Sequence, residues 1–168
     1  GYLLQVLQEQ FGPHVGASPI ALLSVIGRNM VGRIQVAAPG ATLSEPVNAI
    51  EVSALLRGDN SEEAFAELVR QHATSGVSGV VPKFLDAQNE SANAFKKISV
   101  ITRRHIIKGS SHALPFIALN EHLCMQVAAR VAPTAKTEVS EDGQALVVHR
   151  FDVDDDGQAL RGMEDFCS

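Results

Sequence analysis

The apolar positions in the first thirty residues predict two short helices. Residues 2–10 carry four large aliphatic side chains close to one helical face, and a Gly-Pro pair follows soon after. Ser18 is placed to cap a second helix, and Pro19 suits the first helical position because an N–H there would have no intrahelical partner. We expect this second helix to run from Ser18 to Val25 and to end at Gly27.

A strand and a linker are predicted next. Residues 31–36 alternate between apolar and polar side chains, which is typical of a half-buried strand. Residues 37–46 contain two prolines and a glycine and are expected to form a connection on the surface. A boundary near residue 40 would divide the chain into a small leading subdomain, 1–40, and a main body, 41–168.

The main body is predicted to be an α+β fold with an antiparallel sheet. Its longest helix should span 115–130, with an i, i+4 row packed against the sheet: Leu119, Leu123, Val127 and Val131. A second helix is predicted over 61–72, with Phe65, Leu68 and Val69 on its inner side. A turn that contains glycines should lead into a strand over 74–85, and two further strands are predicted over 99–102 and 105–108. The last predicted element is a hairpin of strands 137–140 and 145–151, which turns at Glu141-Asp142-Gly143. Consecutive strands, a long helix and then a hairpin indicate this fold class.

The composition and the net charge exclude a few classes of protein. Of the 168 residues, 45% are hydrophobic and 20% are charged, and the net charge is −5. This balance argues against a surface built to neutralise nucleic-acid phosphates, and no apolar stretch approaches the roughly 20 residues that span a bilayer. The two cysteines, Cys124 and Cys167, lack metal-binding spacing and are expected to be small buried residues. We expect a cytoplasmic protein.

Three segments carry residues suited to nucleotide chemistry. The first is the turn Ser78-Gly79-Val80-Val81-Pro82-Lys83, where glycine lets backbone N–H groups approach phosphate oxygens. The turn matches neither GxxxxGK[ST] nor GxGxxG, so a purely structural turn is the alternative.

The second candidate is a pair of charged residues. Lys108 ends a strand rich in β-branched residues, and Glu121 lies thirteen residues later at the edge of the buried face of the long helix. In protein kinases a strand lysine and a glutamate on the following helix order the contact with the α- and β-phosphates. The alternative is an exposed strand end and a solvated helix charge.

The third candidate is the segment that follows the hairpin strand. His149, Arg150 and Phe151 could offer backbone N–H and C=O groups to an adenine edge, with the Phe151 ring as an apolar wall. The alternative is an ordinary strand end.

Six segments of the chain match the motifs of one known family, in the family's order. They are Ser24 to Gly32 (S-x-IG-x-x-x-VG), Ser78 to Lys83 (SG[VA]QxK), His105 to Lys108 (H-[IV]-[IV]-K), Asn120 to His122 (NE[YF]), Val148 to Asp152 ([VI]ERFD) and Met163 to Cys167 (EDxCQ). Together they cover nearly the whole chain and resemble the HipA-like serine/threonine-protein kinase toxins of type II toxin–antitoxin systems. The resemblance implies a HipA-type leading subdomain followed by a lobe similar to a kinase N-lobe.

The resemblance also implies a role for each matching position. Ser78 to Lys83 would wrap the phosphates of ATP, Lys108 would contact them, and His149 to Phe151 would hold the adenine. Three positions depart from the family pattern. Val81 replaces the usual loop glutamine, His149 replaces the hinge glutamate, and Gly76 stands where the best-studied members carry an inhibitory autophosphorylated serine.

The family's catalytic residues have no counterpart among these motifs. Its catalytic Asp and its residues for Mg²⁺ lie downstream of EDxCQ, and the sequence ends at Ser168. We therefore expect a piece of a longer protein, cut before the catalytic lobe, that holds ATP without transferring phosphate. The resemblance implies that the parent, a kinase associated with persistence, phosphorylates a protein substrate, with translation proteins as candidates, and names an HipB-like antitoxin as a candidate partner. No direct nucleic-acid or membrane binding is expected.

Two alternatives come from other classes of protein. Asp152 to Gly157 fits the opening DxDxDG of an EF-hand calcium loop, but the twelfth position is Met163 and Glu164 is one residue late. The other alternative is a non-catalytic module that docks with a partner protein through its leading helices. A DxxxxN sequence downstream in the parent reading frame would decide for the kinase.

Overall fold

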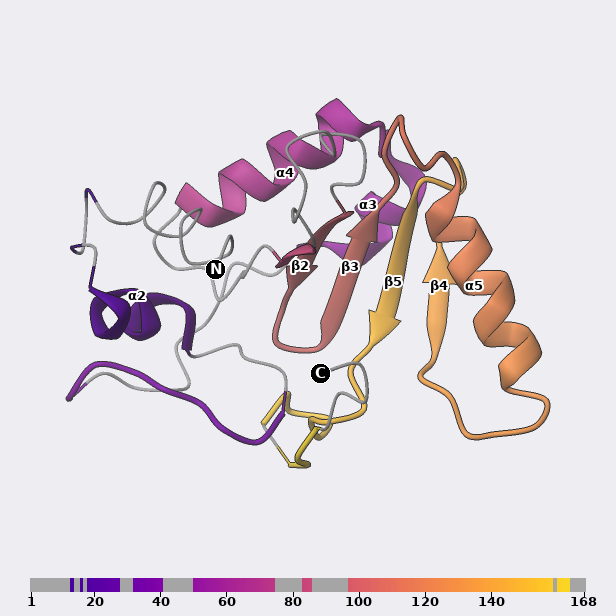
Figure 1. Cartoon of the computed structure of the whole chain (residues 1–168). Coiled ribbons are helices and arrows are strands. Elements are labelled where there is room, and N and C mark those ends of the chain that lie inside the picture. The colour runs from indigo at the N-terminus through magenta and orange to yellow at the C-terminus, as the bar shows by residue number, and fades with distance from the viewer. Residues whose placement is uncertain are drawn as a thin grey trace.

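The centre of the molecule is an antiparallel sheet of five strands in the order β1-β2-β3-β5-β4. The structure is a computed structural model that describes residues 13, 16, 18–27, 32–40, 50–74, 83–85, 97–158 and 160–163. The strands are β1 (Lys83–Leu85), β2 (Lys97–Ile101), β3 (His105–Gly109), β4 (Thr137–Val139) and β5 (Ala145–His149). The helices are α2 (Pro19–Ile26), α3 (Val52–Arg57), α4 (Glu62–Thr74) and α5 (Ile117–Ala128) (Figure 1). The predicted α+β class with an antiparallel sheet is confirmed.

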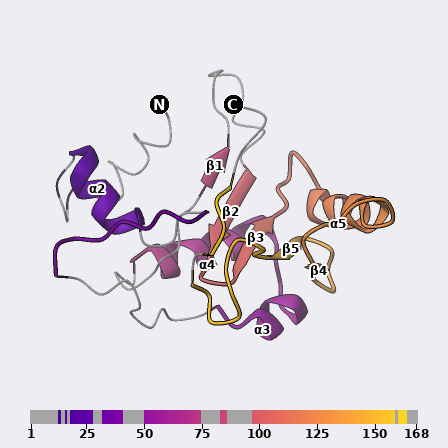
Figure 2. The same ribbon diagram turned by 90° about the horizontal axis from the view of Figure 1, so that it is seen from below.

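The hydrophobic core lies on one face of this sheet. Val100, Ile107 and Val147 are direct neighbours across β2, β3 and β5, and all three are fully buried. Phe65 of α4 and Leu55 of α3 complete the cluster. Alternation along a strand sends the next residues to the opposite face, which α5 covers beside β4 and β5 (Figures 1 and 2).

Local sequence signals explain several of these elements. The Ser18 hydroxyl accepts a hydrogen bond from the Ala21 N–H at 3.1 Å, so α2 starts at Pro19 as expected and ends before Gly27. The β4–β5 hairpin turns through Gly143, whose φ of 71° is a left-handed conformation that favours glycine.

The orientation of α5 differs from the prediction. The helix runs from Ile117 to Ala128, and its residues Leu123 and Val127 are 54% and 71% exposed. The face toward the sheet instead carries Ala118, which is 2% exposed, together with half-buried charged and polar side chains. Because α5 carries apolar residues on more than one side, the periodicity of the sequence did not identify the row of residues that faces the sheet. Val131 is also exposed, and Leu119 is half-buried.

Two further predictions are wrong. Residues 32–36 form no strand, because Val36 docks on the end of α2 instead of pairing with a strand. Its N–H donates to the Gly27 carbonyl at 2.9 Å, and a Cβ on Gly27 would meet the Val36 Cβ at 2.7 Å. Cys124 is exposed on α5, where burial was expected.

Some predictions fall wholly or partly outside the described residues. These are the helix over 2–10, most of the turn before β1, the second half of the 37–46 connection, and Cys167. Residues 38–40 of the connection are exposed, as expected. The boundary near residue 40 stays a prediction. Within the described ranges, no helix is long and apolar enough to cross a membrane.

Candidate functional site

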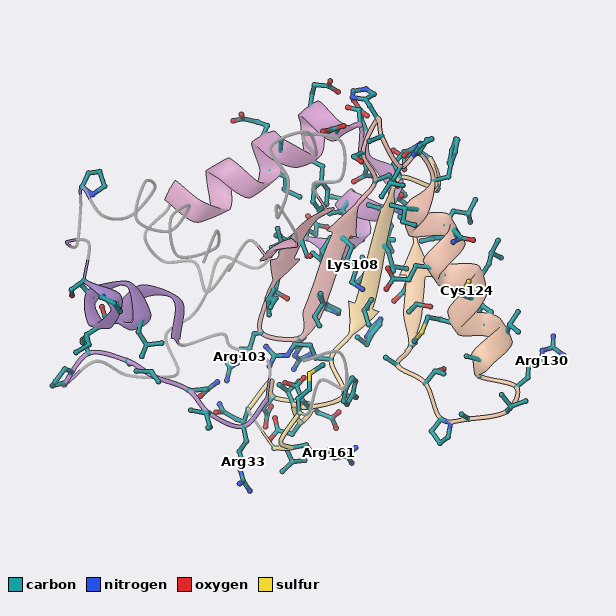
Figure 3. All side chains as sticks on the ribbon, viewed as in Figure 1. Arg33, Arg103, Lys108, Cys124, Arg130 and Arg161 are labelled. Atoms are coloured by element: carbon teal, nitrogen blue, oxygen red, sulfur yellow. The ribbon has the colours of Figure 1, made fainter. Side chains whose placement is uncertain are left out.

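Lys108 and Glu121 meet between the sheet and α5. The Lys108 ammonium Nζ donates a hydrogen bond to the Glu121 Oε1, which confirms the predicted contact. The two side chains are 27% and 25% exposed, so the pair is partly shielded yet open to a ligand. Figure 3 shows Lys108 in the middle of the sheet.

The packing of β3 explains why Lys108 faces α5. Ile107 and Gly109, its neighbours in the chain, lie on the core face, where a Cβ on Gly109 would meet the Phe65 ring at 2.6 Å. The strand therefore cannot turn over without burying the ammonium among apolar side chains. The start of α5 is tied to the same strand end, because the Ser110 hydroxyl accepts the Ala118 N–H at 3.3 Å.

A second predicted lysine falls in the same row of the sheet. Lys108 pairs with Ser99 of β2, and Ser99 in turn pairs with Lys83 of β1. Two strand spacings separate the Cα atoms of the two lysines by about 10 Å. The remaining turn residues, Ser78, Gly79, Val80, Val81 and Pro82, lie outside the described residues, so the phosphate turn stays a prediction.

The predicted adenine segment lies farther along β5. His149 is three residues beyond Leu146, the partner of Lys108, which is about 10 Å along an extended strand. The backbone N–H of His149 donates to Lys136 O and that of Arg150 to Arg104 O, each at 2.8 Å, so both donors are already engaged. Phe151 is about half exposed. The contact of this segment with adenine stays a prediction.

The Arg150 side chain has a structural partner. Its Nε and Nη2 donate to the two carboxylate oxygens of Asp152 at 3.0 and 2.6 Å, and Nη1 donates to Thr102 O at 3.1 Å. The Gly32 N–H, 120 residues away in sequence, donates to the Asp152 Oδ2 at 2.7 Å. The ion pair therefore joins the segment after β5 to the leading part of the chain.

The same pair argues against the calcium alternative. Burial raises the pKa of Asp152, but hydrogen bonds from Arg150 and the Gly32 N–H outweigh it and hold the pKa below its usual range. Its carboxylate is thus committed to a cation and an N–H, although it would have to be the first calcium ligand. Asp154 Oδ1 accepts the N–H groups of Asp156 and Gln158 at 3.0 and 2.8 Å. Among the described residues no three His, Cys, Asp or Glu side chains are grouped to hold a metal ion.

A cluster of His105, His149 and Glu138, where β3 begins and β5 ends, was not predicted. The rings of His105 and His149 meet edge to face with centroids 4.8 Å apart, and His149 Nε2 lies 2.5 Å from Glu138 Oε1. Burial and then the neighbouring His149 lower the pKa of His105, while the hydrogen bond with His149 lowers the pKa of Glu138. The sequence gives little sign of this cluster, because His105, Glu138 and His149 are brought together only by the register of the strands.

The comparison with known families supplies the identity. The model of the HipA-like C-terminal domain matches residues 75–168, more than half of the chain. The chain belongs to this HipA-like family. The matched range contains all five described strands and α5, so the Lys108–Glu121 pair lies within the family domain, whereas α3 and α4 precede it. A comparison with curated proteins gave no match.

Proposed function

We propose that this chain is the ATP-binding part of a HipA-like protein serine/threonine kinase, with the nucleotide phosphates on the α5 face of the sheet. The observation that carries the proposal is the ion pair between Lys108 on β3 and Glu121 on the following helix. Protein kinases use a strand lysine and a helix glutamate in this relation to contact the α- and β-phosphates.

The geometry of the pair suits a phosphate contact. An ammonium group has three N–H donors, so Lys108 can keep its bond to Glu121 while it donates to a phosphate oxygen. Glu121 restrains the flexible lysine stem, which reduces the conformational entropy lost when the ligand binds. Partial burial strengthens the attraction relative to bulk water.

The other elements of the proposed site follow from family membership. Ser78 to Lys83 would wrap the phosphates, and His149 to Phe151 would contact the adenine. ATP would bring Mg²⁺ with it, which bridges the phosphates in this chemistry. We place the Mg²⁺ ligands and the catalytic Asp outside the described residues. A protein substrate of translation and an HipB-like antitoxin are proposed on family grounds alone.

Nucleotide binding tests the proposal directly. We expect a fluorescent ATP analogue to bind the chain weakly and Lys108→Ala to weaken binding by about tenfold or more, since hydrogen bonds to charged groups contribute about 1.5–3 kcal/mol. Lys136→Ala is the matched control, because that lysine is 72% exposed. Equal affinities of the wild-type and Lys108→Ala proteins would remove Lys108 from the phosphate site.

Phosphate transfer tests the kinase assignment. Incorporation of labelled γ-phosphate should be absent for this chain alone and present for a longer protein that continues through a downstream DxxxxN sequence. Lys108→Ala in that longer protein should abolish most of the labelling. Robust labelling by the chain alone would show that the catalytic residues lie within this chain, contrary to the proposal.

A further inference from the structure

Two histidines lie side by side where β3 begins and β5 ends, at the lower end of the sheet in Figure 1. His105 and His149 are direct partners in the strand register, and their rings meet edge to face with centroids 4.8 Å apart. His149 Nε2 donates to the Glu138 carboxylate on β4 at 2.5 Å. All three residues are partly buried, and strand alternation places them on the face of the sheet opposite to Lys108.

The charges around the two rings can balance one imidazolium but not two. The charged groups on the surrounding elements are Glu138 on β4 and Lys136 before it, Arg104 before β3, the buried Arg150–Asp152 pair after β5, and Arg57 of α3, which packs on β5. The Glu138 carboxylate is already shared, because its Oε1 lies 3.9 Å from Lys136 Nζ. The Asp152 carboxylate is bound to Arg150. A second imidazolium would therefore face the first without a carboxylate of its own.

His105 also closes the turn between β2 and β3. Its N–H donates to the Thr102 hydroxyl at 2.9 Å, and its carbonyl accepts the Thr102 N–H at 2.8 Å. The ring that contacts His149 and the backbone groups that hold the turn thus belong to one residue. A displacement of this ring from His149 disturbs the turn as well.

The β2–β3 turn in turn holds the segment that follows β5. Thr102 O accepts a hydrogen bond from Arg150 Nη1 at 3.1 Å, and Arg104 O accepts the Arg150 N–H at 2.8 Å. At the far end of the segment, Arg103 Nε donates to Gly157 O at 3.4 Å; Figure 3 labels Arg103 at this end of the sheet. The histidine pair, the turn and the segment after β5 are therefore connected by direct contacts.

We propose that the His105–His149 pair is a pH-sensitive switch that controls the attachment of residues 150–157 to the β2–β3 turn. While at most one ring carries a proton, the Glu138 carboxylate balances that charge and the attachment is closed. When both rings are protonated, repulsion between them separates the rings and releases the hydrogen bonds of the turn. Residues 150–157 include part of the proposed adenine segment, but the switch operates without any nucleotide.

The direction of the pH dependence follows from the surroundings of His105. Burial, and then the neighbouring His149, lower the pKa of His105 in the closed state. Opening exposes the ring to water and removes these causes. The closed state is therefore favoured above the ordinary histidine pKa of about 6.5. It loses this advantage as the pH falls through the lower pKa of the closed state, so acid should open the switch.

Amide hydrogen exchange measured by NMR separates local opening from unfolding of the whole domain. The reporter is the Arg150 N–H, which is bonded to Arg104 O across the switch. The reference is the Ser140 N–H, which is bonded to Ala145 O at 2.9 Å at the opposite end of β5. After correction for intrinsic exchange, lowering the pH from about 7.5 to about 5 should reduce the protection of Arg150 by about threefold or more relative to Ser140.

Three variants test the role of the ring. His105→Phe keeps an aromatic ring at the contact but cannot take up a proton, so it should abolish this pH dependence. His105→Lys carries a charge at both pH values, so the protection of Arg150 should already be low at the higher pH. His112→Gln is the matched control, because it removes a histidine whose side chain is 76% exposed, and it should leave the pH dependence intact.

Several results would overturn the proposal. An equal loss of protection at Arg150 and Ser140 would show that acid destabilises the whole domain and opens no switch. The same pH dependence in the His105→Phe protein, or its loss in the His112→Gln protein, would also contradict it. If His105→Phe does not fold, the wild-type protein still decides, because the ring resonances of His105 must titrate in the pH interval in which the protection of Arg150 falls.

The outcome is independent of the proposed ATP site. The exchange experiment contains no nucleotide, and none of its variants changes Lys108 or the residues proposed to contact ATP. Failure of the switch would therefore leave the proposed function standing, and failure of ATP binding would leave the switch standing.

Discussion

Replacing Asp152 by asparagine should strongly destabilise the fold. Its side chain is 1% exposed, and that of its partner Arg150 is 2% exposed. The replacement keeps the shape of the side chain but removes its negative charge. The NH2 group of the asparagine, a hydrogen-bond donor, would then face another donor, either the guanidinium or the Gly32 N–H. The guanidinium then remains buried without the negative charge of Asp152.

The expected loss can be estimated from this geometry. Breaking a buried pair by removing one partner costs about 3–5 kcal/mol. A domain of ordinary stability has about 5–15 kcal/mol in total. With a urea dependence of about 2 kcal/mol per molar, a loss of 4 kcal/mol would lower the unfolding midpoint by about 2 M.

Urea unfolding followed by circular dichroism measures this loss. Asp156→Asn, at an exposed position in the neighbouring turn, is the control and should change stability by less than about 0.5 kcal/mol. Arg150→Met combined with Asp152→Leu should recover most of the loss, since apolar replacement of both partners is often neutral. A loss below about 1 kcal/mol for Asp152→Asn, or a double variant less stable than the single one, would refute the reasoning.

Three further predictions concern other parts of the fold. Burial raises the pKa of Asp142, but hydrogen bonds from Ser140, the Gln144 N–H and Asn60 outweigh it and lower the pKa. The contribution of Asp142 is therefore present above its unfolded pKa of about 3.9 and is lost as pH falls through the lower folded value. Acid unfolding should be less steep for Asp142→Asn, and an unchanged pH profile would contradict this. Gly109→Ala should cost about 1–3 kcal/mol in urea unfolding because its Cβ would meet the Phe65 ring, whereas Gly162→Ala, with open space around it, should be nearly neutral. Val127→Gln should change stability by less than about 0.5 kcal/mol because the side chain is 71% exposed, and a loss above 1 kcal/mol would show that Val127 is buried in solution.

The sequence by itself determined the elements whose signals are local. The Ser18 cap, the alternation in β3, the helix around Phe65 and the turn at Gly143 each depend on residues within a few positions of one another. The Lys108–Glu121 contact was also predictable. Strand alternation sends Lys108 away from the core, and Glu121 lies at the edge of the buried face of the next helix.

Only the tertiary structure decided which surfaces meet. Leu123 and Ala118 are both apolar residues of α5, and packing against β4 and β5 selected Ala118. Residues 32–36 have a strand pattern, but the Val36 N–H donates its hydrogen bond to the Gly27 carbonyl at the end of α2 and not to a strand. The Asp152–Gly32 bond and the contact between His105 and His149 both join residues far apart in the chain. Such contacts depend on strand register and helix docking, which are set by the summed burial of the whole domain and not by any short segment of sequence.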